Sequence, residues 1–208
     1  MLLRINPDNI LTEDIYRVAD ILKNNGVIIY PTDSVYAMGC SLHSPKGIEK
    51  LARIKKTEPE KLNLSLICSD LSHLSDYTRP IPNTVFRIMK KALPGPYTFI
   101  LPASNEVPKL FLKQSKKTVG IRVPANSICQ EIVKILGSPL VSASLHNEED
   151  ELVDYFTEPD NIYLYFEQIA DAVIDGGYGN IYPTTVIDCT GEEPEVIREG
   201  LGALTIFD

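Results

Sequence analysis

Four segments of the sequence end an apolar run, typical of a buried strand, in side chains that could bind a ligand. They are residues 32–36, Arg122, the pair Ser142 and Ser144, and Thr185 with the nearby Arg198. Ligands of open α/β sheets bind beyond the strand ends, where loops offer hydrogen-bond donors. Hydroxyl groups and arginine forks suit carboxylates and phosphates. These segments therefore predict a site for an anionic substrate.

No catalytic machinery of a covalent kind is visible. The sequence holds no acid/base pair, no Ser-His-Asp order, no nucleophile elbow and no P-loop. An enzyme built on these residues would act on phosphates by positioning and electrostatic clamping. The three histidines and four cysteines do not cluster, so we expect no protein-only metal site and reduced, buried thiols. These residues are His43, His73 and His146, and Cys40, Cys68, Cys129 and Cys189.

Each segment also has a purely structural interpretation. Residues 31–33 could form only a turn, and Arg122 could be a strand-edge arginine that reaches solvent. Ser142 and Ser144 could serve tight packing. The lysines Lys55, Lys56 and Lys61 could lie on a solvated face. The combination of segments, more than any one of them, favours a binding site.

The charge of the chain is unevenly distributed. The net charge is −8. Residues 1–122 carry 18 basic and 11 acidic side chains, a net charge of +7, whereas residues 123–208 carry 2 and 17, a net charge of −15. The first part could present a basic surface to phosphates, and the second could not. A solvated acidic half that balances a basic half is the alternative.

Length and composition are those of one globular domain, residues 1–208. The start of the chain has no signal-peptide pattern, and no apolar run reaches the ~18 residues of a membrane span. We therefore expect a cytoplasmic protein without a membrane partner.

Helical and strand patterns alternate along the first part, and strands dominate the last. We expect an edge strand at 1–5, a helix that Thr12 caps and Gly26 ends at C′, and a buried strand at 27–30. No strand is predicted between Tyr30 and a helix opened by Ser44. Further helices are expected at 83–92, 127–136 and 163–169, and strands at 62–68, 97–101, 116–123, 140–144, 172–174, 184–188 and 195–198. This order predicts an α/β domain with a twisted sheet of mixed direction.

Six motifs, in this order, resemble the YrdC/TsaC family of L-threonylcarbamoyladenylate synthases. They read PTDSVYAMG (31–39), PGPYTFIL (94–101), VGIRVP (119–124), PLVSAS (139–144), PTTVID (183–188) and REG (198–200). The resemblance covers about residues 12–205. It implies a single-domain, twisted open sheet of parallel and antiparallel strands with flanking helices and a concave cavity.

The resemblance also implies a nucleotidyltransferase reaction. Family members convert ATP, L-threonine and bicarbonate into threonylcarbamoyl-AMP and pyrophosphate, assisted by Mg²⁺, for the t6A modification at position 37 of tRNA. By position in the motifs, Thr32, Tyr36 and Ser142 would bind threonine and bicarbonate, and Lys55 and Arg122 would be catalytic. The nucleotide would contact four residues, Lys56, Ser144, Thr185 and Arg198. Other proteins of the t6A pathway are possible partners.

Two departures from the family pattern point to its YciO-like branch. The family's Lys-x-Arg-Pro is here Lys55-Lys56-Thr57-Glu58, without the arginine, and Lys56 or Lys61 would replace it only as a point charge. Leu145-His146 stand where the family has Ala-Asn, and the acidic run 148–151 follows.

Two alternatives to the synthase follow. One is a related enzyme that uses the same cavity for another carbamoyl or acyl adenylate. The other is a protein that binds tRNA or double-stranded RNA through the basic cavity, with an affinity that falls steeply with salt.

Overall fold

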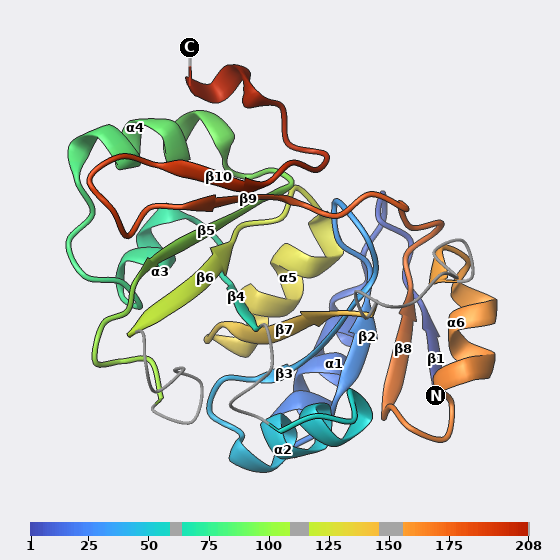
Figure 1. The fold of residues 1–208 in the computed structure, drawn as a ribbon. Coiled ribbons are helices and arrows are strands. Elements are labelled where there is room, and N and C mark those ends of the chain that lie inside the picture. The colour runs from blue at the N-terminus through green and yellow to red at the C-terminus, as the bar shows by residue number, and fades with distance from the viewer. Residues whose placement is uncertain (59–63, 109–116, 146–155, 208) are drawn as a thin grey trace.

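The computed structural model describes residues 1–58, 64–108, 117–145 and 156–207. Figure 1 shows a strongly twisted sheet with helices on both faces. The strands are β1 (Leu2–Arg4), β2 (Ile28–Tyr30), β3 (Ala37–Ser41), β4 (Ser65–Ile67), β5 (Tyr97–Pro102), β6 (Thr118–Arg122), β7 (Leu140–Ser144), β8 (Ala172–Asp175), β9 (Thr185–Asp188) and β10 (Glu195–Arg198). The helices are α1 (Thr12–Lys23), α2 (Pro45–Ile54), α3 (Leu71–Ser75), α4 (Asn83–Ala92), α5 (Ser127–Leu136), α6 (Pro159–Phe166) and the 3-10 helix η4 (Leu204–Phe207).

All ten strands of the described residues belong to one sheet in the order β1-β8-β2-β3-β7-β4-β6-β5-β9-β10. Four neighbouring pairs are parallel, namely β1/β8, β2/β8, β4/β6 and β5/β9. The other pairs are antiparallel. The predicted α/β class, with a twisted sheet of mixed direction, is confirmed. The single-domain boundary 1–208 stays a prediction.

Two hydrophobic cores cover the two faces of the sheet around β2. Ile28 and Tyr30 pack with α1 and α5 on one face, whereas Val27 and Ile29 contribute to the larger core on the other. That larger core includes side chains of α2, α3, α4 and α6. Because both faces are covered, the β2 segment is apolar throughout instead of alternating.

The strands β5 and β6 alternate between buried and partly exposed residues along most of their length. Along β5, Tyr97, Phe99 and Leu101 are buried, and the residues between them are partly exposed. The same alternation runs along β6, where Gly120 is partly exposed and Ile121 is buried. The partly exposed face carries the small residues Ser65, Thr98 and Gly120, with Ile100 and Pro102 further along β5. A sheet surface of small polar side chains is thus accessible beside the end of β6.

Most predicted boundaries agree with the structure. The helices 83–92 and 127–136 and the strands 140–144 and 195–198 have the expected ends. Ser44 caps α2 by accepting a hydrogen bond from Gly47 N, and Asp70 caps α3 in the same way from His73 N. Gly137 ends α5 with φ 73°. The edge position of β1 and the four free, buried cysteines are also confirmed.

Both predicted ends of the first helix are wrong. Thr12 is the first helical residue, and the N-cap position is held by Leu11, without a side-chain hydrogen bond. At the other end Asn25, not Gly26, has the left-handed conformation, with φ 65°. Gly26 N donates to Ile21 O and Asn25 N to Leu22 O, which completes a Schellman motif. The glycine is needed one position later, because a Cβ at Gly26 would lie 2.4 Å from Ile21 Cγ2.

The strand β3 was not predicted. Its sequence, AMGCS, has no β-branched residue, so local propensity gives no sign of it. The strand exists because it pairs with β2 on one side and β7 on the other. Gly39 allows the close approach, since a Cβ there would lie 2.9 Å from Val141 O and 3.0 Å from Tyr30 Cε1. The helix predicted at 163–169 in fact begins at Pro159 and ends at Phe166.

Candidate active site

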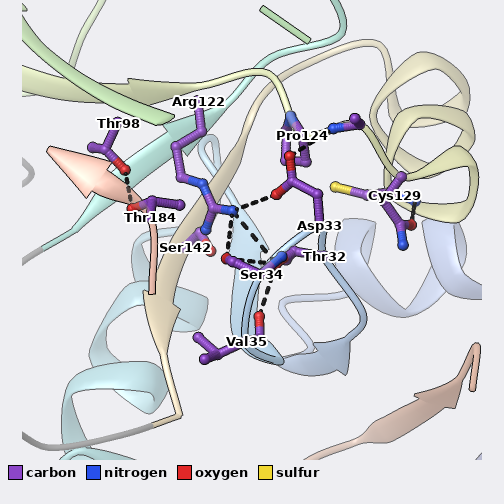
Figure 2. Close-up of polar contacts among 12 residues, drawn as sticks. Thr32, Asp33, Ser34, Val35, Thr98, Arg122, Pro124, Cys129, Ser142 and Thr184 are labelled. Atoms are coloured by element: carbon purple, nitrogen blue, oxygen red, sulfur yellow. Dashed lines mark hydrogen bonds and ion pairs between the residues drawn. The ribbon is translucent and has the colours of Figure 1, made fainter. Parts of the chain in front are cut away.

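The side chain of Arg122 links the end of β6 to the turn between β2 and β3. Its Nη2 donates to Asp33 Oδ1 at 3.0 Å, to Ser34 Oγ at 3.1 Å and to Thr32 Oγ1 at 3.4 Å (Figure 2). The Arg122 side chain is 8% exposed, so the alternative of a solvent-reaching strand-edge arginine is wrong. All three contacts use Nη2. Nε is buried and has no hydrogen-bond partner among the described residues.

The turn itself is held by its own hydroxyl groups. Thr32 Oγ1 donates to Val35 O at 2.7 Å and accepts from Ser34 N at 3.1 Å. The second carboxylate oxygen of Asp33 accepts from Ala125 N at 2.8 Å. Asp33 therefore bridges the turn to the chain after β6 and compensates the buried guanidinium. It was not among the predicted site residues, although it stands in the middle of the opening motif.

Two predicted substrate-binding residues have hydrogen-bond partners within the fold. Ser142 accepts a hydrogen bond from Tyr30 Oη at 2.6 Å and is 2% exposed. Tyr36 Oη donates to Gly177 O at 2.7 Å and accepts from Gly176 N at 3.3 Å. Burial raises the pKa of both tyrosines above the usual value of a phenol. Both phenols therefore stay protonated: that of Tyr30 links β2 to β7, and that of Tyr36 holds the loop after β8.

The predicted lysines lie at the end of α2. Lys55 Nζ donates to Ser144 O at 2.9 Å and to Leu145 O at 3.3 Å, which joins α2 to the end of β7. The hydroxyl-bearing residue Ser144 is itself exposed. Lys56 has φ 50° and lies just after the end of the helix. Lys55 and Ser144 are thus close together, and their roles stay a prediction.

The predicted nucleotide-binding residues near the C-terminus form a second group. Arg198 donates from Nε and Nη2 to Thr184 O at 3.2 and 3.1 Å. Thr184 Oγ1 lies 2.8 Å from Thr98 Oγ1, on the same side of the sheet as Arg122 (Figure 2). Thr185 is fully buried, and its hydroxyl donates to Gly202 O and accepts from Gly200 N. Position therefore favours Thr184 and Thr98, which sequence reasoning missed, over Thr185 as hydroxyls beside the site.

A cavity of about 440 Å³ adjoins the turn that holds Arg122. One wall is the turn itself, residues 32–34, and the other is the loop between β8 and β9, residues 178–181. The two walls are tied together by Asn180 N, which donates to Ser34 O at 3.2 Å, and by the Tyr36 phenol at Gly177. The loop was not predicted as part of the site.

Other predicted features lie outside the described residues. These are Lys61, His146 and the acidic run 148–151. Within the described residues, no group of three His, Cys, Asp or Glu side chains is arranged to hold a metal ion. No helix in the described part of the chain is long and apolar enough to cross a membrane.

The sequence and fold match known proteins over nearly the whole chain. Residues 20–200 match the Sua5/YciO/YrdC family, whose description reads "Telomere recombination". The chain belongs to this family. It is 42% identical over 203 residues to the uncharacterized protein YciO of Escherichia coli K12, an alignment that covers 98% of this chain and 97% of YciO. The E. coli YciO crystal structure superposes with a TM-score of 0.91 and covers all of this chain.

More distant family members include a named synthase. The threonylcarbamoyl-AMP synthase of Halorhodospira halophila is 28% identical over 179 residues, which cover 86% of each chain. The structure of P. abyssi Sua5 complexed with L-threonine is 22% identical with a TM-score of 0.83, and it covers 96% of this chain and 57% of that one. At that identity the likeness concerns the fold, and it confirms the predicted architecture.

Proposed function

We propose that this family member is a nucleotidyltransferase that forms threonylcarbamoyl-AMP and pyrophosphate from ATP, L-threonine and bicarbonate. The observation that carries the proposal is the buried Arg122, oriented by Asp33 and two hydroxyls beside an accessible sheet surface of small polar side chains. The synthase of H. halophila supports the reaction. The threonine bound to P. abyssi Sua5 supports the amino-acid substrate.

The chemistry requires the enzyme to hold two anions together. The threonine amine and CO₂ from bicarbonate form a carbamate, whose oxygen attacks the α-phosphorus of ATP in line while the bond to pyrophosphate breaks. The negative charge that develops on the phosphoryl oxygens and on the leaving pyrophosphate must be dispersed. The cations that could do so here are Arg122, Lys55 and Arg198, with Lys56 beside Lys55.

Each cation would have a separate task. Arg122 is fixed by its Nη2 contacts, so its remaining donors would face the carboxylate of threonine or a phosphate. Lys55, held against the end of β7, would orient the substrate beside Ser144. Arg198 lies with Thr184 and Thr98 and would contact the phosphates. Thr32, Tyr36 and Ser142 would shape this pocket through the turn and loop contacts they make.

We expect Mg²⁺ to enter with ATP as part of the substrate. Mg²⁺ keeps several waters and is usually bound by substrate phosphates with one or two carboxylates. The carboxylate of Asp33 is already engaged by Arg122 and Ala125. The described residues therefore fit a metal held mainly by the nucleotide.

The test is pyrophosphate release by the purified protein with ATP, Mg²⁺, bicarbonate and L-threonine, omitting each in turn. Release that requires both threonine and bicarbonate, with threonylcarbamoyl-AMP detected by mass spectrometry, is the expected result. Arg122→Lys, which keeps the charge and removes the fork, should lower kcat/KM by about tenfold to a hundredfold. Arg17→Lys, the same change at an exposed arginine on α1, is the matched control. ATP bound without release would contradict the proposal.

A second candidate is a related enzyme with another carbamoyl or acyl group. The position of the family arginine is taken by Thr57, and Lys55 already donates to two backbone carbonyls. The phosphate grip of this chain therefore differs from the family pattern. A panel of amino acids and carbamoyl phosphate in the same assay separates the two candidates. Binding of tRNA, double-stranded RNA or other t6A-pathway proteins stays a prediction.

A further inference from the structure

A hollow of about 350 Å³ lies between the end of α3 and the first turn of α4, and its lining includes Ser75, Thr78, Arg79, Ile81, Asn83 and Phe86. Arg79 N donates to Pro102 O at 2.9 Å, which ties this segment to the last residue of β5. Pro102 pairs with Thr118 at the start of β6, whereas Arg122 ends that strand. The hollow and the candidate active site therefore lie at opposite ends of β6 (Figure 1).

The first turn of α4 presents backbone amides that no side chain caps. Pro82 holds the N-cap position, and Phe86 N donates to Pro82 O at 2.9 Å as the first bond of the helix. The amides of Asn83, Thr84 and Val85 come before it, and they donate to no atom of the described residues. The turn also carries no acidic side chain. Free amides and the positive end of the helix dipole favour a negative charge at this point.

Thr78 adds a buried hydroxyl to the same region. Its side chain lines the hollow and is 7% exposed, and Oγ1 makes no hydrogen bond within the described part of the chain. The backbone of Thr78 is fixed by a bridge to Ala103. Buried hydroxyls have a partner in the protein or in a bound molecule, because an unsatisfied one costs about 1–3 kcal/mol. This second observation, independent of the helix end, indicates a ligand at the same place.

Charge and apolar surface define the kind of ligand. Of the described residues that line the hollow, only Arg79 is charged, and its side chain is exposed. Asp76 follows Ser75 in the chain and lies outside this lining. Ile81 and Phe86 supply apolar surface beside the arginine, and Phe86 is 38% exposed. One cation at a helix end fits a single negative charge, and the apolar surface fits a hydrocarbon group attached to it.

We propose that this hollow binds a carboxylate that carries an apolar group. The carboxylate would accept hydrogen bonds from the first amides of α4 and from Arg79, with the Thr78 hydroxyl as a further donor. The apolar group would cover Ile81 and Phe86. Two sources offer this chemistry, a small organic acid and the C-terminus of a peptide whose last residue is apolar. The site is separate from the proposed function, because it shares no residue with the candidate active site.

Benzoate and benzamide are a matched pair of probes, because they have similar shapes and only benzoate is charged. Titration of the ¹⁵N-labelled protein with benzoate should shift the amide resonances of Asn83, Thr84 and Val85 saturably, and benzamide should not. Arg79→Gln should weaken benzoate binding about tenfold or more. Arg87→Gln is the matched control, since Arg87 is an exposed arginine of α4 outside the lining of the hollow. Absence of a saturable shift, or equal losses in the two variants, would overturn the inference.

Thr78→Val distinguishes a hydroxyl that binds a ligand from one that serves the fold. Valine keeps the shape and removes an unsatisfied group, so urea denaturation should show a free protein at least as stable as wild type. The affinity for benzoate should fall about threefold or more in the same variant. A less stable protein, or an unchanged affinity for benzoate, would contradict the inference.

A peptide probe distinguishes the two sources of the carboxylate. N-acetyl-glycyl-phenylalanine that binds more tightly than benzoate, with the binding lost in its C-terminal amide, would assign the site to a peptide terminus. Tighter binding of benzoate would assign it to a small organic acid. Inorganic phosphate that binds as tightly as benzoate would show that the apolar group contributes nothing, and it would overturn the inference.

Discussion

Arg122 and Asp33 form a buried ion pair that joins segments 89 residues apart. Nη2 of the arginine lies 3.0 Å from Oδ1 of the aspartate, and the two side chains are 8% and 7% exposed. The pair connects β6 to the turn after β2, which also lines the neighbouring cavity. The same contact therefore holds the fold together and orients the cation of the proposed site.

Removal of Asp33 should destabilise the protein strongly. Asp33→Ala leaves the guanidinium buried without a counter-charge, so we expect a loss of about 3–5 kcal/mol in the free energy of unfolding. Urea denaturation measures this loss. Asp14→Ala is the control, since Asp14 forms only a surface pair with Arg17, at 3.7 Å, and should cost less than about 1 kcal/mol. Similar losses in the two variants would show that the buried pair contributes no more than a surface pair.

Local patterns in the sequence predict the elements with strong periodicity and clear stops. The helix α4 ends before the Pro-Gly-Pro segment, and α5 ends at Gly137, both as expected. The strand β3 could not be predicted, because pairing on both sides creates it from a segment of low strand propensity.

The candidate site also has features that the sequence predicts and features that only the structure reveals. The motifs point to the turn at residues 32–36 and to Arg122, and the structure brings these two segments into contact. They do not reveal that Asp33 is the partner of Arg122, nor that the loop 178–181 lines the cavity, since both depend on tertiary contacts across long stretches of chain. The role of Thr185 was inferred from the motif alone, and burial of the side chain could not be foreseen from it.

Ser142 offers a test of whether a predicted substrate residue is structural. Ser142→Ala leaves the buried Tyr30 phenol without its acceptor and should cost about 1–3 kcal/mol in the free energy of unfolding. The double variant Tyr30→Phe/Ser142→Ala removes both partners and should recover part of this loss. If activity recovers with stability in the double variant, Ser142 acts through the fold. If stability recovers and pyrophosphate release does not, the hydroxyl of Ser142 contacts the substrate.

Alkaline pH should destabilise the protein. Burial raises the pKa of Cys40, Cys129 and Cys189 from 9.0 to about 12. Above pH 9.0 these thiols ionise in the unfolded chain and stay protonated in the folded one, so proton release favours unfolding. Their contribution is therefore complete below pH 9.0 and is lost progressively toward about pH 12. Cys40 and Cys129 should each remove about 1 kcal/mol per pH unit in this range, and the less buried Cys189 should remove less.

Urea denaturation at pH values on either side of 9.0 measures this slope. Cys40→Ala should lower the free energy of unfolding at neutral pH, because it leaves a cavity. It should also reduce the slope of this free energy against pH in the alkaline range by the contribution of one thiol. A wild-type slope that Cys40→Ala does not change would contradict the assignment of the effect to buried thiols.

A substitution at Thr57 tests whether the proposed phosphate contact lacks the arginine of the family pattern. Thr57 stands where the family pattern has arginine. It follows Lys56 at the end of α2, and its backbone N donates to Ala52 O at 3.0 Å. A guanidinium at this position could form two parallel bonds to a phosphate, which a lysine cannot. Thr57→Arg should therefore raise the affinity for ATP about tenfold. Calorimetry with a non-hydrolysable ATP analogue measures the affinity, and pyrophosphate release measures the consequence for turnover.

Thr57→Lys is the matched control, since it adds the same charge without the fork. A higher ATP affinity in both variants would show that a positive charge is sufficient. A higher ATP affinity in Thr57→Arg only would show that the two parallel hydrogen bonds of the guanidinium are needed. If Thr57→Arg raises ATP affinity and threonine-dependent pyrophosphate release together, this chain retains the synthase site in a weakened form. If ATP binds more tightly but threonine turnover does not rise, the departure from the synthases lies in the part of the proposed site that binds the amino acid. In that part, Lys55 donates a hydrogen bond to the end of β7. That outcome would favour the enzyme with a changed substrate.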